Sequence, residues 1–309
     1  MLHALPNLTV HQLVYVQAAL RSPSWTEAAV DLGVTQSAMS QAIAEIERRL
    51  GVALFDRRGR FRVPTLAGSA VGAVASEIIA SIDDLTGRLV EIETGTRGVL
   101  RIGMIDTAAL GLLAEPLSAF RTANPAVRTT LLVEPSVPLT NRVRNGELDL
   151  AAVVIPNPAL AGDEENFEIQ RVDREPIFVY APPGVSGHGG SWGPWVMYPA
   201  GSQTRSLIEQ ALSARGIDLT VEAESSNPDV LRQMVRLGVG WCALPASVAE
   251  NGPQPLLRAD PQPLTTRTIA LVRRRNALQN GSVELFRSQV AKTSSMLPAV
   301  LTKPTPSRV

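Results

Sequence analysis

The segment TEAAVDLGVTQSAMSQAIAEIERRLG, residues Thr26–Gly51, decides the fold of the N-terminal part of the chain. Ser24 is a favourable N-cap for a short helix, and Glu27 three residues later completes the pattern of a capping box. Gly33 ends this first helix. Thr35 then caps a second helix, which runs to the final glycine of the segment. Two helices joined by a short turn that contains glycine are typical of a helix-turn-helix.

The second of these helices has an apolar face and a polar face. Its residues Ile43, Ile46 and Leu50 share the face that we expect to point inward. Near the N-terminal end, four polar side chains point outward: Gln36, Ser37, Ser40 and Gln41. Such amides and hydroxyls can hydrogen-bond to base edges in the major groove of DNA, and a glutamine can bind adenine through two hydrogen bonds. The alternative interpretation is a solvated helix face without a ligand.

Arginines gather just after this helix. Residues 47–62 hold six arginines and two carboxylates, an excess of four positive charges, although the whole chain balances 29 basic against 29 acidic residues. Arg57, Arg58 and Arg60 surround Gly59, which we expect at the tip of a hairpin wing. Guanidinium groups there would contact phosphates or the minor groove. The neutral average therefore does not exclude a nucleic-acid partner.

The stretch after Thr65 predicts a long helix with heptad spacing. The apolar positions follow one another at intervals of four and three residues: Val71, Ala75, Ile78, Ile82, Leu85, Leu89 and Ile92. This repeat is typical of helices that pair in a coiled coil, so we expect the helix to dimerise the protein. The alternative is an amphipathic helix that packs on its own domain.

The remaining two thirds of the chain alternate between strands and helices. The expected strands are Val99–Ile105, Val127–Val133, Leu148–Val154, Ile177–Ala181, Trp195–Tyr198, Leu219–Ala223, Gly240–Leu244 and Thr268–Val272. The expected helices include Ala109–Ala123, Leu139–Asn145, Thr204–Arg215 and Pro228–Leu237. Apolar strands that alternate with helices predict an α/β fold with a mainly parallel sheet. Two such halves can face each other across a cleft.

Composition excludes several other classes of protein. One cysteine, Cys242, rules out a disulfide within the chain, and three scattered histidines argue against a metal site. We find no catalytic constellation and expect no metal, no cofactor and no enzymatic activity. The sequence also shows no secretory signal, and polar residues interrupt every apolar stretch, so we expect a soluble, cytoplasmic protein without a membrane span.

Several motifs together resemble the LysR-type transcriptional regulators. Besides the opening segment, these are LFDRRGRFRVPTLAG (Leu54–Gly68), GVLRIGMIDTAAL (Gly98–Leu110), NGELDLAAVV (Asn145–Val154) and LGVGWCALP (Leu237–Pro245). They occur in the order and at the spacing of that family, along the whole chain. The resemblance implies a winged helix-turn-helix over 1–64, a linker helix over 65–94 and a periplasmic-binding-protein-like effector domain over 97–297, with a tail over 298–309. Subdomain I would comprise 97–167 and 266–297, and subdomain II would comprise 168–265.

The resemblance also implies roles for individual residues. The DNA-binding residues would be Thr26, which matches a phosphate-contacting hydroxyl, and Thr35, Gln36, Ser37, Ser40, Gln41, Arg57, Arg58 and Arg60. The effector-binding residues would be Thr107, Ser136, Ser202, Gln203 and Thr204, because ligands in α/β sheets gather beyond strand ends and at helix N-termini. For each of these the alternative is a helix cap without a ligand. Ile105 and Val154 are apolar where some relatives carry threonine, and Asp106 would repel a carboxylate, so we expect a less anionic effector.

The function expected from these features is that of a transcriptional regulator tuned by a small molecule. Its partners would be a double-stranded DNA operator, a small-molecule effector and further copies of itself in a homodimer or homotetramer, with RNA polymerase as an additional candidate. The main alternative is an intracellular small-molecule-binding protein without regulatory DNA binding. An enzyme with an appended helix-turn-helix is a third hypothesis, disfavoured by the missing nucleophile or metal constellation.

Overall fold

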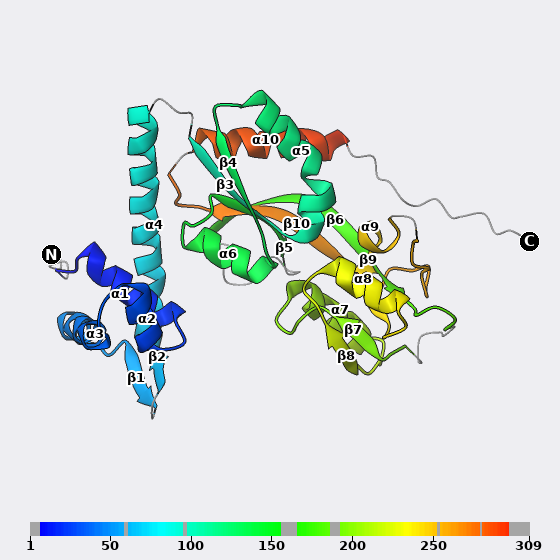
Figure 1. The fold of residues 1–309 in the computed structure, drawn as a ribbon, viewed down its shortest axis with the longest axis horizontal. Coiled ribbons are helices and arrows are strands. Elements are labelled where there is room, and N and C mark those ends of the chain that lie inside the picture. The colour runs from blue at the N-terminus through cyan, green and yellow to red at the C-terminus, as the bar shows by residue number, and fades with distance from the viewer. Residues whose placement is uncertain are drawn as a thin grey trace, which may run out of the picture. The chain divides into compact units, whose positions relative to one another are not determined.

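The chain forms two compact units, of which the first comprises residues 1–93 with 144–147 and the second comprises the rest (Figure 1). A computed structural model describes residues 7–58, 61–94, 98–155, 166–185, 192–251, 254–278 and 280–296.

The first unit begins with three short helices, α1 (Val10–Arg21), α2 (Trp25–Asp31) and α3 (Gln36–Leu50). The hydroxyls of Ser24 and Thr35 cap α2 and α3 as expected, by accepting hydrogen bonds from backbone N–H groups three residues on. The reciprocal half of the capping box at Ser24 is absent, because the Glu27 carboxylate accepts from the Ser24 hydroxyl instead of its backbone N–H. The complete capping box lies at the start of α1, between Thr9 and Gln12.

A hairpin of β1 (Phe55–Arg58) and β2 (Phe61–Pro64) follows α3. Gly51 ends α3 in the left-handed conformation with φ of 71°, which costs glycine little. The carboxylate of Glu47 then accepts the backbone N–H groups of Leu54 and Phe55, at 2.7 and 3.1 Å. These bonds fix the hairpin to the C-terminal end of α3. The unit is therefore a helix-turn-helix with an attached wing, over a core that includes Val16, Met39, Ile43, Ile46 and Leu54.

The long helix α4 (Leu66–Thr94) completes this unit. The apolar heptad positions of this helix, from Val71 to Ile92, form its seam. Val71 packs against the helix-turn-helix and Ala75 is buried. Gln17 of α1 donates to the hydroxyl of Ser76 at 3.1 Å. The next four positions are exposed in the single chain, by 39, 37, 51 and 56% for Ile78, Ile82, Leu85 and Leu89 respectively. The side chain of Ile92 lies outside the described residues. Contacts within the unit therefore cover the first two apolar positions of the seam, whereas the next four side chains remain exposed.

Part of α4, Leu66–Gly87, is long and apolar enough to cross a membrane by length and composition alone, with a mean hydropathy of 1.4. This differs from the expectation of no such segment, because alanines between the larger apolar residues keep the mean hydropathy high despite the interspersed serines and glycines. The same composition suits a helix whose apolar side pairs with another protein helix.

A sheet of six strands organises the second unit, in the spatial order β4-β3-β5-β10-β6-β9. The strands are β3 (Val99–Met104), β4 (Arg128–Val133), β5 (Leu150–Ile155), β6 (Phe167–Tyr180), β9 (Cys242–Pro245) and β10 (Thr265–Arg274). Only β3 with β4 and β3 with β5 pair in parallel; the other three pairings are antiparallel. The expectation of a mainly parallel sheet was therefore wrong for this sheet. The apolar content of a strand indicates how deeply the strand is buried. It does not indicate the direction of the strand, which depends on the connection between that strand and its neighbours in the sheet.

Helices and a second, smaller sheet surround these strands. The helices are the π-helical η1 (Ala108–Leu112), α5 (Ala114–Ala123), α6 (Ser136–Arg144), α7 (Gln203–Ser213), α8 (Pro228–Arg236), α9 (Ala246–Ala249) and α10 (Gly281–Met296). Figure 1 shows α5 and α10 on one side of the sheet and α6 on the other. The parallel pair of β7 (Trp195–Met197) and β8 (Val221–Glu224) forms the smaller sheet. Apolar residues gather in two clusters, one around β3, β5 and α10 and one around β7, β9 and α7.

Two further expectations for this unit needed correction, and one helix was missed. The single helix expected over Ala109–Ala123 is divided into η1 and α5, because Pro116 has no N–H and fits only the first turn of a helix. The strand expected over Ile177–Ala181 begins ten residues earlier, at Phe167. Polar residues in its first half, which is only partly buried, concealed it. Helix α10 was not among the predicted elements.

The start of α4 generates a prediction about stability. A Cβ atom on Gly68 would lie 2.0 Å from the backbone oxygen of Leu54, whereas one on Gly87, in the same helix, would meet nothing within 4 Å. Gly68→Ala should therefore destabilise the first unit by about 1–3 kcal/mol through overpacking. Gly87→Ala, the matched control, should stabilise it by about 0.5–1 kcal/mol through helix propensity.

Hydrogen exchange of the α1–α3 amides in the full chain, as a function of denaturant, measures both effects. Equal protection in the two variants would show that the close approach of Gly68 to Leu54 does not constrain this unit.

Candidate functional site

The N-terminal half of α3 presents the polar face that the sequence predicts. Gln36, Ser37 and Gln41 are exposed, and Ser40 is half-buried. Met39, Ile43 and Ile46 on the opposite face are buried in the core of the unit. The core therefore fixes the helix while the polar end stays free to meet a ligand. A polar helix end of this kind can enter the major groove of DNA.

The two threonines of the predicted DNA-binding set lie at helix starts. Thr35 accepts the backbone N–H of Ala38 at 3.1 Å and so caps α3. Thr26 is the second residue of α2 and is exposed. The free N–H groups of a helix start, together with a hydroxyl, suit contact with a phosphate.

The arginines near this surface differ in how they are held. Arg48 and Arg49 of α3 both pair with Glu45, with N···O distances of 2.7 and 2.6 Å. Hydrogen bonds from Arg48 and then Arg49 lower the pKa of the Glu45 carboxyl to about 2. Two of the six clustered arginines thus have an internal counter-ion, Glu45, which lies two residues before the segment 47–62. Arg57 and Arg58 lie on β1 of the wing, and Arg60 lies outside the described residues.

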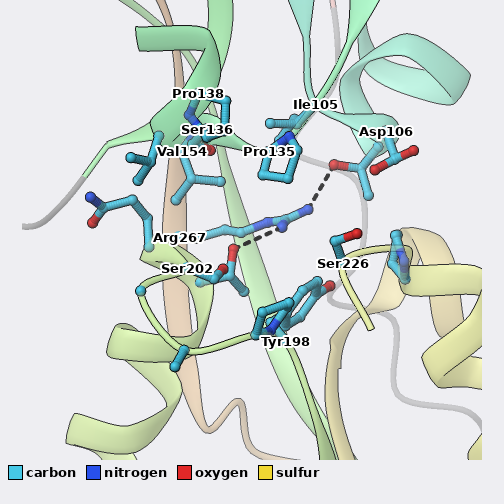
Figure 2. A pocket seen from close by; sticks show the side chains of 18 residues that line it. Ile105, Asp106, Pro135, Ser136, Pro138, Val154, Tyr198, Ser202, Ser226 and Arg267 are labelled. Atoms are coloured by element: carbon cyan, nitrogen blue, oxygen red, sulfur yellow. Dashed lines mark hydrogen bonds between the residues drawn. The ribbon is translucent and has the colours of Figure 1, made fainter. Parts of the chain in front are cut away.

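The second unit contains a cavity of about 360 Å³ (Figure 2). It is lined by Ile105, Asp106, Thr107, Pro135, Ser136, Val137, Pro138, Val154, Tyr198, Pro199, Ala200, Gly201, Ser202, Gln203, Thr204, Ser226, Pro228 and Arg267. All five residues predicted to bind an effector are among them. Ile105 and Val154 belong to one apolar cluster and Tyr198 to the other, so residues of both clusters form its wall.

The secondary structure explains why these side chains meet. Thr107 follows the C-terminal end of β3, and Ser136 begins α6 after β4. Ser202 caps α7, where its hydroxyl faces the N–H of Arg205 at 3.5 Å. The hydroxyl of Ser136 accepts the N–H of Val154 on β5, at 3.0 Å. The N-termini of α6, α7 and α8 all contribute residues to the wall, so three positive helix ends adjoin one cavity.

Arg267 is the central polar residue of the cavity, and the sequence analysis missed it. Its side chain is 3% exposed, and it donates to the carboxylate of Glu175 from Nε and Nη2, at 2.8 and 2.7 Å. Nη2 also donates to the hydroxyl of Thr107 at 2.8 Å, and Nη1 donates to the hydroxyl of Thr204 at 3.3 Å (Figure 2). Ser247 donates to the other oxygen of Glu175. Two of the predicted effector-binding hydroxyls are therefore also acceptors for this guanidinium.

The position of Arg267 follows from strand register. Arg267 on β10 lies directly opposite Glu175 on the antiparallel β6. Both residues lie just outside the strands that the sequence predicts, which start at Thr268 and Ile177. An arginine and a glutamate next to buried strands were the available signal, but nothing in their spacing indicates that they pair.

Four polar side chains of the wall have no hydrogen-bond or ion-pair partner among the described residues. They are the Tyr198 hydroxyl, the Asp106 carboxylate, the Gln203 amide and the Ser226 hydroxyl. The Tyr198 side chain is 6% exposed, and burial raises the pKa of its phenol above the ordinary value. Asp106 and Tyr198 appear on different sides of Arg267 in Figure 2. The wall thus offers hydrogen-bond donors and a carboxylate at separate places.

Other chemistry has little support in the described part of the chain. Its residues contain no group of three or more histidine, cysteine, aspartate or glutamate side chains that could hold a metal ion. Cys242 is buried in the core as expected, and burial raises the pKa of its thiol. A thiol kept protonated in this way is a poor nucleophile.

Two family models match the chain. Residues 10–69 match the bacterial regulatory helix-turn-helix protein of the lysR family, and residues 93–295 match the LysR substrate binding domain. The chain is 25% identical to the uncharacterized HTH-type transcriptional regulator YfeR of Shigella flexneri, over 95% of this chain and 96% of that protein. It is 28% identical to the HTH-type transcriptional activator CmpR of Synechocystis sp., over 84% of this chain and 87% of that one.

Solved structures share the fold. The crystal structure of CbnR, a LysR family transcriptional regulator, superposes with a TM-score of 0.58 at 20% identity and covers 93% of this chain and 99% of that one. CbnR complexed with its target DNA gives a TM-score of 0.56 at 19% identity, with 93 and 100% of the two chains covered. The first family model spans the helix-turn-helix and its wing, and the second spans the α/β unit. The chain belongs to the LysR family of DNA-binding transcriptional regulators.

Proposed function

We propose that this protein is a cytoplasmic one-component regulator whose operator binding is adjusted by a small molecule in the cavity of its second unit. The observation that carries the proposal is the convergence of Thr107, Ser136 and Ser202–Thr204 on one cavity around Arg267. The proposal contains no catalytic step. RNA polymerase is a further partner that such a regulator would contact.

The DNA-reading part of the proposal rests on α3 and the wing. Gln36, Ser37, Ser40 and Gln41 would meet base edges, and Thr26, Thr35 and the wing residues Arg57, Arg58 and Arg60 would contact the backbone or minor groove. The exposure of the polar end of α3 and its fixation by a buried opposite face support these roles. Base contacts discriminate sequences, whereas phosphate contacts position the protein and make binding depend on salt.

The sensing part follows from how Arg267 is held. Thr107 follows β3 and Thr204 lies in the first turn of α7, so one guanidinium joins elements that belong to different apolar clusters. A ligand changes an equilibrium only by binding one arrangement better than another. A molecule that bonds to Arg267 or to these hydroxyls changes the contacts between the two halves of the unit, and so meets this condition. In this proposal, subdomain I comprises residues 97–167 and 266–297, and subdomain II comprises residues 168–265.

Self-association through α4 is the third part of the proposal. Ile78, Ile82, Leu85 and Leu89 form an uncovered apolar row on one helix. A second copy of the same helix would bury this row, as in a coiled coil. A homodimer would also present two recognition helices to a two-part operator, and two such dimers would form a tetramer.

The first prediction concerns operator specificity. Gln36→Ala should reduce affinity for the operator by about 1–3 kcal/mol and leave non-specific affinity nearly intact, because it removes a base contact. Arg58→Ala should weaken both kinds of binding and reduce the slope of log affinity against log salt by about one, because it removes a phosphate contact.

Fluorescence anisotropy with DNA that flanks the protein's own gene, titrated at several salt concentrations, measures both effects. Gln210→Ala, an exposed glutamine on α7, is the matched control. Unchanged operator preference in the Gln36 variant would remove this residue from the base-reading set.

The second prediction concerns the α4 seam. Ile78→Asp with Ile82→Asp should dissociate the full-length assembly at micromolar concentration, since each buried isoleucine contributes about 1.5–3 kcal/mol. The control Ala73→Asp with Gly87→Asp adds the same charge to the helix but avoids the seam positions. Sedimentation velocity should show a change of mass for the first pair only. If both pairs behave like the parent protein, the seam is not the contact that holds the copies together.

The third prediction separates sensing from DNA binding. Thr107→Val keeps the side-chain shape but removes a hydroxyl that lines the cavity and accepts a hydrogen bond from Arg267. Because the effector loses this polar contact, its binding should weaken by about 1–3 kcal/mol. Operator affinity without effector should remain that of the parent, because the substitution lies outside the helix-turn-helix. Thr122→Val on the exposed side of α5 is the control.

Thermal-shift screening of metabolites identifies the effector for this test, and calorimetry and anisotropy then measure the two affinities. Loss of operator binding in a folded Thr107 variant would contradict the assignment of this threonine to the cavity function.

A further inference from the structure

The charges around the cavity indicate which class of molecule it accepts. The only cation among its lining residues, Arg267, already has a counter-ion in Glu175 directly behind the wall. Asp106, by contrast, has no hydrogen-bond or ion-pair partner among the described residues. The formal charges of Arg267, Glu175 and Asp106 sum to −1. The wall therefore has an unmatched carboxylate and no unmatched formal positive charge.

Hydrogen-bond donors without acceptors lie elsewhere on the same wall. A guanidinium has five N–H hydrogens, and four hydrogen bonds from Arg267 are formed, so one hydrogen on Nη1 remains. The Tyr198 hydroxyl is buried and makes no hydrogen bond. An unpaired buried donor is unfavourable until it meets an acceptor. The N-termini of α6, α7 and α8 add partial positive charge beside these groups.

The space between these polar groups is small and largely apolar. Ile105, Pro135, Val137, Pro138, Val154 and Pro228 form most of the apolar lining. A volume of about 360 Å³ is at the lower end of the range of about 300–1,000 Å³ for small-molecule sites. The occupant is thus a compact molecule with an apolar body.

We propose that the effector is a compact amino acid, a zwitterion whose ammonium group pairs with Asp106 and whose carboxylate receives hydrogen bonds from Arg267, Tyr198 and the helix N-termini. This inference rests on the proposed function, since it names the ligand class of the same cavity. A zwitterion satisfies the unmatched carboxylate and the unmatched donors together without adding net charge.

Other charge classes fit less well. A dicarboxylate or a phosphate ester would place additional negative charge near Asp106 and would leave that carboxylate without a partner. A simple amine would pair with Asp106 but would leave the Tyr198 hydroxyl unpaired and face three positive helix ends. An acid without an amino group would accept hydrogen bonds from Arg267 and Tyr198 but would leave the Asp106 carboxylate without a partner. The amino group and the carboxylate of the ligand should therefore both contribute to its affinity.

The test begins with the full-length protein and a thermal-shift screen of the standard amino acids together with β-alanine and 4-aminobutyrate at millimolar concentration. At least one of them should raise the melting temperature. Calorimetry then compares this amino acid with two analogues of the same carbon skeleton, one without the amino group and one without the carboxylate. Each analogue should bind at least tenfold more weakly. Absence of any shift across the panel would overturn the proposal, and so would equal affinity for the amine-free acid.

Two variants assign the ends of the ligand. Asp106→Asn should weaken binding of the amino acid at least tenfold while leaving the amine-free acid unchanged or tighter, so that the preference for the amino group disappears. A structural defect would weaken both compounds equally. Tyr198→Phe should weaken the amino acid and the amine-free acid by the same factor but leave the affinity for the analogue without the carboxylate unchanged, whereas a structural defect would weaken all three compounds. Glu115→Gln, an exposed carboxylate outside the cavity, is the control and should leave both affinities unchanged.

Operator binding distinguishes this inference from the proposed function. If a dicarboxylate or a phosphate ester binds the cavity and alters operator affinity, the regulator proposal stands and the amino-acid class is wrong. If an amino acid binds with the expected dependence on Asp106 but operator affinity is unaffected, the ligand class stands and the proposed coupling to DNA fails.

Discussion

The geometry of the ligand-binding unit depends on the buried ion pair between Arg267 and Glu175. Removing two charges from water is costly, and such a pair persists only where hydrogen bonds satisfy the rest of both groups. Thr107, Thr204 and Ser247 provide those bonds. Since these three residues come from η1, α7 and α9 or their starts, the ion pair also holds distant parts of the unit at fixed distances. The cavity wall is built around this arrangement.

The same arrangement makes the cavity suitable for sensing. Glu175 neutralises the guanidinium without filling its last N–H, so the site keeps a directed donor but no excess positive charge. Strand ends and helix N-termini place further donors around it, while Ile105 and Val154 keep one side apolar. Selectivity then comes from the match between the polar groups of the ligand and the few polar groups of this small cavity, because burying an unpaired polar atom is energetically unfavourable.

The DNA-binding unit faces a different constraint, because one helix serves two kinds of neighbour. The first turns of α4 pack on the helix-turn-helix, where Gly68 lies against the backbone of Leu54 and Ala75 is buried. Further along, Ile78, Ile82, Leu85 and Leu89 are uncovered in the single chain. A continuous heptad repeat supports both parts, since the same side of the helix first meets its own unit and then remains available for a second copy.

Local chemistry by itself determined much of this protein. Caps such as Thr35, glycines such as Gly51 and the spacing of apolar residues act within a few residues of the chain, so the helix-turn-helix, the long helix and the α/β character followed from the sequence. The polar residues Thr107, Ser136 and Ser202 followed too, because each lies at a strand end or a helix start. Tertiary structure alone decided the direction of the strands and the pairing of Arg267 with Glu175, which are 92 residues apart. It also left the Tyr198 hydroxyl buried without an acceptor. These features depend on strand register and on packing between distant segments, and residue spacing along the chain carries no record of either.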